Sequence, residues 1–158
     1  MKREHNTIYL LKQTELTFEK VSNEILKPYA LTHAQFKIIK YLYTVEGQTV
    51  IQKDIEQYFR MSSVTVARLL VNLEKNDWIV RTQSERDKRQ NLIRLTEKAK
   101  NLKVEFETVS DQLESRLTGR LDATELEELR SLLRKMLAID LDESQILLSL
   151  CRLLPLHK

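Results

Sequence analysis

Glycine and proline are scarce in this 158-residue chain, which holds two of each. Sandwiches and barrels need these residues at their many turns, so the scarcity argues against an all-β architecture and favours long helices. No apolar run approaches the ~18 residues that a membrane-spanning helix needs. The N-terminus is polar and charged and lacks the apolar region of a signal peptide. We therefore expect neither secretion nor membrane association.

Cysteine and histidine are equally sparse. Cys151 is the only cysteine, so an intrachain disulfide is excluded and a cytoplasmic location is expected. It lies in a leucine-rich segment, where burial would make the thiol inert. The three histidines, His5, His33 and His157, show no metal-ligand spacing. We expect no metal site and no cofactor.

Charge of both signs is present but is unevenly placed. The formal net charge is +3. The stretch from Arg81 to Lys100 holds seven basic and three acidic residues, a net of +4, whereas Asp122 to Glu143 holds seven acidic and three basic residues, a net of −4. Only the first of these stretches is suited to face a polyanion.

Apolar residues make up 42% of the chain and recur with helical spacing over much of it. Pro28 should end the first helix, and Thr32 with Gln35 forms a capping box for the second. A tight turn follows the third helix, and Ser62 caps the fourth. Two short helices joined in this way form a helix-turn-helix. The helices are predicted over residues 4–27, 32–45, 51–59 and 62–75.

The periodicity changes after residue 77. Residues 78–81 and 91–95 are predicted strands on either side of the charged loop 82–90. A hairpin directly after a helix-turn-helix is a wing. Thr96 then restarts a helix that should run to Gly119.

Two more apolar segments follow. A helix is expected to open at Asp122 or Thr124, and the segment 144–154 is strongly apolar. The long terminal helices have no partner inside a compact DNA-binding core, which indicates a two-fold dimer. We predict a mainly α winged helix-turn-helix with a two-stranded wing and long terminal dimerisation helices. Residues 1–30 form the N-terminal dimerisation helix, 31–95 the DNA-binding region and 96–158 the C-terminal dimerisation helices, in one compact domain.

The helix at residues 62–75 is the candidate recognition helix. Its N-terminus offers free backbone N–H groups and hydroxyls to a phosphate or a base edge. Arg68 has the reach to bind guanine O6 and N7 in the major groove, and Lys75 is suited to a phosphate. The alternative is a solvated polar face without a partner. The candidate DNA-binding residues of this helix are Ser62, Ser63, Thr65, Arg68, Asn72 and Lys75.

The wing loop carries a second candidate contact. Arg86, Lys88 and Arg89 are suited to enter a minor groove, where negative potential is concentrated. Asp87 would repel phosphate, so its expected role is to pair with Arg89 or Arg86 and hold the shape of the hairpin. The alternative here is a charged loop that binds nothing.

The stretch from Leu31 to Lys98 resembles the MarR family of bacterial transcriptional regulators. The resemblance implies an obligate dimer on a pseudo-palindromic operator, with Asp87 and Arg89 as the wing-stabilising pair. It also implies a repressor released by a small aromatic effector, although some members respond to thiol oxidation or zinc. Asp77 and Arg60 stand where the family usually has glycine. The segments that carry the resemblance are Leu31–Phe36, Ser62–Leu70, Leu73–Arg81, Asp87–Arg89 and Leu95–Lys98.

The expected function is therefore sequence-specific binding of double-stranded DNA by a homodimeric transcriptional regulator, most plainly a repressor. An enzyme is not expected, because the chain has no glycine-rich phosphate loop, nucleophile elbow or HExxH motif. The alternative is a winged-helix protein-interaction module without specific DNA binding. The scarcity of acidic residues on the recognition helix and wing favours DNA as the partner. No effector-binding residue is assigned, and the role of residues 141–158 and the choice between repression and activation stay open.

Overall fold

The computed structural model describes residues 6–85 and 87–137. These residues fall into two compact units, one that ends at Arg116 and one that begins at Leu117. Arg86, His5, Cys151, His157 and the apolar segment 144–154 lie outside the described residues. The dimerisation roles assigned to residues 1–30 and 96–158 stay predictions.

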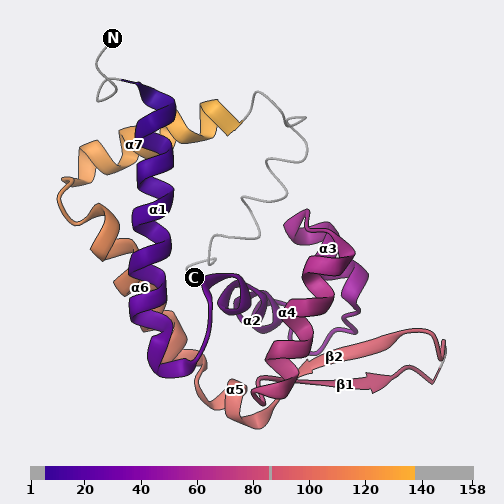
Figure 1. The fold of residues 1–158 in the computed structure, drawn as a ribbon. Coiled ribbons are helices and arrows are strands. Elements are labelled where there is room, and N and C mark those ends of the chain that lie inside the picture. Colours follow the sequence, from indigo (N-terminus) through magenta and orange to yellow (C-terminus); the bar gives the residue numbers. More distant parts are fainter. Residues whose placement is uncertain (1–5, 86, 138–158) are drawn as a thin grey trace. The chain divides into compact units, whose positions relative to one another are not determined.

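The elements confirm a mainly α winged helix-turn-helix with a two-stranded wing (Figure 1). The strands are antiparallel and pair from Ile79 with Leu95 to Gln83 with Asn91. The elements are α1 (Thr7–Leu26), the 3₁₀ helix η2 (Lys27–Tyr29), α2 (His33–Thr44), α3 (Gln52–Phe59), α4 (Ser63–Lys75), β1 (Ile79–Gln83), β2 (Asn91–Leu95), α5 (Glu97–Asn101), α6 (Lys103–Thr118) and α7 (Ala123–Leu137).

Polar caps begin the helices where the sequence predicts them. The hydroxyls of Thr32, Ser62 and Thr96 each accept a hydrogen bond from a backbone N–H of the first helical turn. The capping box of Thr32 with Gln35 is complete. These caps satisfy N–H groups that have no partner inside the helix, which fixes each helix start to one residue.

One predicted helix boundary is confirmed and another is wrong. As expected from Pro28, α1 ends at Leu26, and Pro28 lies in the 3₁₀ turn η2 that follows. The helix expected from Thr96 to Gly119 is broken at Leu102 into α5 and α6. There the Leu102 N–H bonds the Ala99 carbonyl in a tighter turn, and the same carbonyl accepts a hydrogen bond from the Tyr43 hydroxyl.

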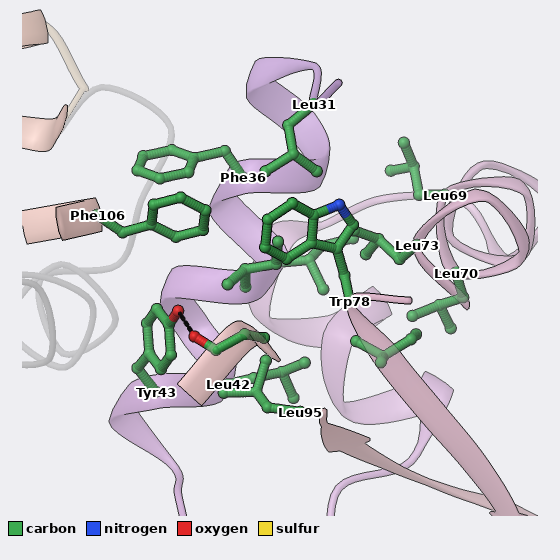
Figure 2. Packing of buried hydrophobic residues seen from close by; sticks show 14 of the residues in the cluster. Leu31, Phe36, Leu42, Tyr43, Leu69, Leu70, Leu73, Trp78, Leu95 and Phe106 are labelled. Atoms are coloured by element: carbon green, nitrogen blue, oxygen red, sulfur yellow. Dashed lines mark hydrogen bonds between the residues drawn. The ribbon is translucent and has the colours of Figure 1, made fainter. Parts of the chain in front are cut away.

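The core of the first unit is centred on the ring of Phe106, which α6 inserts between other aromatic rings (Figure 2). The rings of Tyr29, Phe36 and Trp78 lie 5.0, 5.2 and 5.5 Å from it, centroid to centroid. Trp78 is 2% exposed although it is the residue that leads into the wing. The start of α6 is therefore packed directly onto the winged helix-turn-helix.

Three helices end in left-handed turns formed by residues other than glycine. Ala30, Arg60 and Asp77 have φ values of 52°, 52° and 59°. At the end of α4, the Trp78 N–H bonds the Leu73 carbonyl and the Asp77 N–H bonds the Glu74 carbonyl. This pattern is a Schellman motif, in which glycine is the usual left-handed residue.

The second unit contributes α7, whose first turn is capped by Asp122. Its carboxylate accepts hydrogen bonds from the N–H groups of Thr124 and Glu125 at 2.8 and 2.9 Å, and the Glu125 carboxylate bonds back to the Asp122 N–H. Several apolar side chains of α7 remain exposed. Within residues 6–85 and 87–137, none of the helices has both the length and the apolar character needed to cross a membrane.

Replacing Asp77 with glycine should raise the free energy of unfolding by about 0.5–1 kcal/mol, because the left-handed backbone strain disappears. Asp77→Val should lower it by about 1–2 kcal/mol. Asn76→Gly is the matched control, since Asn76 has a φ of −94° and glycine relieves no strain there. Urea unfolding of the three variants measures the effect, and a stabilising Asn76→Gly would contradict the account.

His33 should make stability depend on pH. Burial lowers the pKa of its imidazole to about 4, with a smaller contribution from the charge of Lys37, and its ring packs edge-on against Phe18 at 4.4 Å. Because the folded pKa lies below the unfolded value of about 6.5, this stability is fully present above pH 6.5 and is lost as pH falls towards 4.

We expect a loss of about 1–2 kcal/mol across that window for the native chain, a value reduced for partial solvent screening. His33→Gln should flatten this part of the profile, which thermal unfolding between pH 7.5 and pH 4.5 would measure. Equal slopes for the two proteins would rule out His33 as the cause.

Candidate nucleic-acid interface

The helix-turn-helix is formed by α3, α4 and the turn between them. Arg60 takes the left-handed position in that turn, and the Met61 N–H bonds the Glu56 carbonyl at 3.1 Å. One face of α4 is buried in the core, through Val66, Leu69, Leu70 and Leu73. The opposite face of α4 is left to solvent, as a recognition helix requires.

Hydroxyls at the N-terminus of α4 are already engaged. The Ser62 Oγ accepts a hydrogen bond from the Thr65 N–H at 3.2 Å and lies 2.8 Å from the Thr65 Oγ1. The Ser63 Oγ accepts a hydrogen bond from the Gln52 Nε2 at 3.0 Å. Ser62 therefore serves first as a helix cap, and Gln52 ties α3 to the first turn of α4. The role of Gln52 has no signal in the sequence, because it depends on a contact between two helices.

The remaining candidates of α4 point outward. Arg68, Asn72 and Lys75 are exposed along the helix. Two apolar residues that sequence reasoning did not select, Val64 and Val71, are 81% and 50% exposed on the same side. Their helical phase, opposite to the buried stripe, is the signal that could have identified them.

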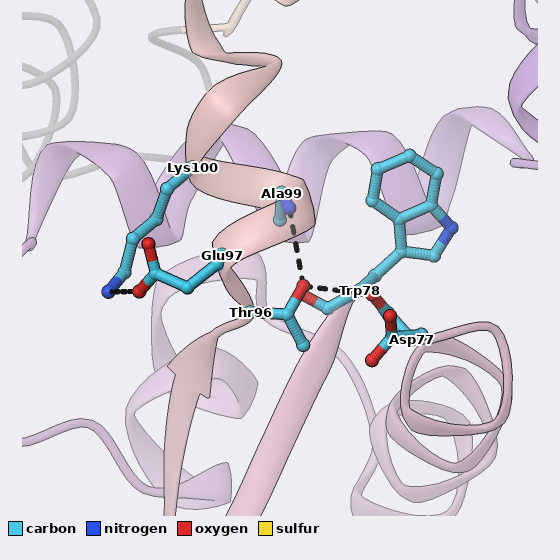
Figure 3. Close-up of polar contacts among 6 residues, drawn as sticks. All are labelled: Asp77, Trp78, Thr96, Glu97, Ala99 and Lys100. Carbon is cyan, nitrogen blue, oxygen red and sulfur yellow. Dashed lines mark hydrogen bonds and ion pairs between the residues drawn. The ribbon is translucent and has the colours of Figure 1, made fainter.

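A junction at the end of α4 holds the helix, the wing and α5 together (Figure 3). The Thr96 Oγ1 donates to the Asp77 carbonyl at 2.8 Å and accepts from the Ala99 N–H at 3.2 Å, while the Thr96 N–H bonds the Trp78 carbonyl. The Lys98 Nζ lies 4.1 Å from the centre of the Trp78 ring. These contacts fix where the wing leaves the recognition helix.

An ion pair links α4 directly to β1. The Arg81 Nε lies 2.9 Å from the Glu74 Oε2, and the Arg81 backbone N–H donates to Oε1 at 3.2 Å. The hydrogen bond from the Arg81 side chain lowers the pKa of Glu74. The sequence shows Glu74 only as an acid on the recognition helix, whereas the structure pairs its charge with a cation.

The wing tip is shaped by backbone hydrogen bonds. The Asp87 carboxylate accepts from the Arg89 N–H at 3.0 Å, and the Asp87 carbonyl accepts from the Gln90 N–H at 2.9 Å. Asp87 thus contacts the backbone of Arg89, and its predicted pairing with the side chain of Arg89 or Arg86 stays a prediction. The side chains of Lys88 and Arg89 are exposed.

A cavity of about 360 Å³ lies between α3, α4 and the wing. Cationic residues line it together with apolar ones, among them Lys53, Leu70, Arg81, Arg89 and Ile93. The part of the chain that the structure describes holds no group of three or more histidine, cysteine, aspartate or glutamate side chains placed to bind a metal ion.

The fold and the outward face of α4 define a winged helix-turn-helix protein, and comparison with known proteins identifies its family. Residues 20–106 match the family described as Transcriptional regulator SarA/Rot. The HTH-type transcriptional regulator YwoH of Bacillus subtilis (strain 168) is 34% identical over 113 residues, which are 66% of this chain and 80% of that protein. The chain belongs to the SarA/Rot family of transcriptional regulators, and the resemblance to MarR-family winged-helix regulators is confirmed.

Solved structures agree with this assignment. The crystal structure of a Staphylococcus aureus MepR–DNA complex matches with a TM-score of 0.76 and 28% identity, covering 84% of this chain and 97% of that one. A mutant MarR from E. coli in complex with operator DNA matches with a TM-score of 0.71 and 26% identity, covering 81% of this chain and 91% of that one.

The ion pair between Glu74 and Arg81 should contribute a coupling energy of about 0.5–1 kcal/mol, because it is partly exposed and its geometry is favourable. A double-mutant cycle with Glu74→Gln, Arg81→Met and both together, followed by urea unfolding, would measure it. Additive effects of the two single changes would mean that the pair does not hold α4 to β1.

Proposed function

We propose that this chain binds an operator in duplex DNA as a homodimer and represses transcription from it. The observation that carries the proposal is the outward stripe of α4, where Arg68 and Lys75 are exposed and the nearby acid, Glu74, is paired with Arg81. A surface of this kind is attractive to a polyanion and repels few phosphates.

In this proposal, α4 enters the major groove. Arg68 reads a guanine through O6 and N7, while Lys75 contacts a backbone phosphate. The N-terminal residues Ser63 and Thr65, with backbone N–H groups of the first turn, lie against the sugar-phosphate backbone or a base edge. Asn72 adds a second polar side chain on the same face.

The wing supplies the second contact. Lys88 and Arg89 are placed at its tip, and Arg86 precedes them in the sequence; we propose that these cations enter the adjacent minor groove. Asp87 holds the tip through the Arg89 backbone. Contacts of α4 and the wing together fix the position of each protomer on the duplex.

Apolar side chains left uncovered in each unit support the homodimer. In α1, Ile8, Tyr9, Leu10, Leu11 and Leu16 are between 39% and 77% exposed. In α7, Leu129, Leu132, Leu133, Met136 and Leu137 are between 37% and 63% exposed. Burying such surfaces against a second copy removes them from water, and the resulting two-fold symmetry would match a pseudo-palindrome with half-sites ~10 bp apart or a small multiple of that.

The same proposal holds that a small aromatic effector releases the protein from its operator. It also places the protein in the bacterial cytoplasm, where an operator is found. The MepR–DNA and MarR–operator structures support the DNA partner. The competing function, a protein-interaction module, would leave α4 without preference for any duplex.

Arg68→Ala should cost about 1–3 kcal/mol of operator binding and relax base preference at one position of each half-site. Lys75→Ala should weaken binding to all sequences alike and reduce the salt slope by about one. Lys20→Ala, which removes an exposed lysine on α1, is the charge-matched control.

The measurement is binding of the purified protein to the duplex upstream of its own gene and to duplexes selected from a random pool, over a salt series with competitor DNA. Two protomers per site and a loss confined to the α4 variants are expected. Binding that never exceeds that of random duplex would favour the protein-interaction function.

A further inference from the structure

Val64 is the most exposed of the large hydrophobic side chains in the described ranges, at 81%. It lies in the first turn of α4, between Ser63 and Thr65. An exposed valine gains nothing for the fold, and its β-branched side chain lowers helix propensity. Its exposure on the recognition helix leaves this side chain accessible to a partner outside the protein.

The helical phase of Val64 is that of the DNA-facing cations. At 3.6 residues per turn, Val64, Arg68, Val71 and Lys75 follow one another at intervals of four, three and four residues, and so share one stripe. Val66, Leu70 and Leu73 fill the opposite side and are buried. Four residues of helix rise about 6 Å, so Val64 stands one turn before Arg68 along the groove.

An apolar side chain that stands next to a cation in such a stripe fits one feature of the major groove. Base edges there present hydrogen-bond donors and acceptors, and the one apolar group among them is the 5-methyl group of thymine. A methylated cytosine carries a methyl group at the same ring position. A protein partner would need a broader apolar patch, whereas Val64 has Arg68 next to it on the stripe and hydroxyl-bearing residues on both sides in sequence. The charge of the stripe likewise favours nucleic acid.

We propose that Val64 contacts the 5-methyl group of a thymine in each half-site and thereby sets base preference beside the base read by Arg68. The inference rests on the proposed function, because it presupposes that α4 lies in the major groove. It assigns to an apolar residue a share of the specificity that the polar residues of α4 do not cover.

The test replaces thymine by uracil, which removes the methyl group and leaves the hydrogen-bonding edge unchanged. A tight-binding duplex is first selected from a random-sequence pool with the full chain, and each thymine is then replaced singly. For the native protein, one position in each half-site should lose about fourfold in affinity, the value of one buried carbon group.

Val64→Ala should bind the thymine duplex about fourfold more weakly per half-site and should be insensitive to uracil at that same position. Val104→Ala is the matched control, since Val104 is a 75% exposed valine on α6. Thermal unfolding confirms that each variant is folded, and Val64→Thr, which keeps one methyl group, should retain part of the uracil effect.

The outcomes separate the inference from the function. A specific duplex whose affinity depends on Arg68 but on no thymine methyl would overturn the role of Val64 and leave the function standing. A further outcome is an affinity that depends on a methyl group only when cytosines are methylated, with Val64→Ala removing that dependence. This result would identify 5-methylcytosine, and not thymine, as the base that Val64 contacts. If Val64→Ala weakens binding but does so equally for the thymine duplex and for every uracil-substituted duplex, the Val64 side chain contacts something other than a methyl group. Failure to select any duplex would overturn the proposed function itself.

Discussion

The burial of Trp78 directly after a left-handed turn is the constraint on which the rest of the DNA-binding region depends. The turn at Asp77 ends α4 and brings the indole into the core, where it is 2% exposed. The same two residues supply carbonyls to Thr96, which closes the hairpin and opens α5. Recognition helix, wing and following helix thus share one junction, and none can be displaced without exposing a large aromatic side chain.

A second chain of contacts extends from this junction to α6. Phe106 packs against Trp78, and Tyr43 holds the carbonyl at Ala99 where α5 turns into α6. Because close-packed interiors transmit displacement, a shift at the start of α6 would be felt at the end of α4. The break at Leu102 lies shortly after Leu95, where the region assigned to DNA ends and the helices assigned to dimerisation begin.

Local signals were enough to predict most of the fold. The capping residues Thr32, Ser62 and Thr96 mark where helices begin, because each accepts a hydrogen bond from the first turn of its own helix. Predicting these starts therefore needs no information about residues distant in sequence. The break at Leu102 escaped prediction because the Tyr43 hydroxyl that reaches the Ala99 carbonyl comes from a helix far away in sequence. The ion pair of Glu74 with Arg81 was missed for the same reason, since it crosses from helix to strand.

The candidate site could be predicted only in part. Exposure of Arg68, Asn72 and Lys75 follows from the helical phase of the buried stripe, and the same phase places Val64 and Val71 outward. The valines are not identified by polarity, which is the property that singles out the other candidate residues of α4. The sequence does not show that the Ser63 hydroxyl accepts a hydrogen bond from Gln52 or that the Asp87 carboxylate accepts one from the Arg89 backbone. Which of these side chains touch DNA stays a prediction.

The junction also has an optical consequence. Trp78 is the only tryptophan in the chain, and it lies beneath Lys98 and beside Phe106, at the meeting point of α4, the wing and α6. Its fluorescence emission therefore reports on a single buried environment, and the emission maximum shifts when water reaches the indole ring. The protein thus carries an intrinsic fluorophore at the junction of α4, the wing and α6, so a displacement of that junction can be followed by fluorescence without any label.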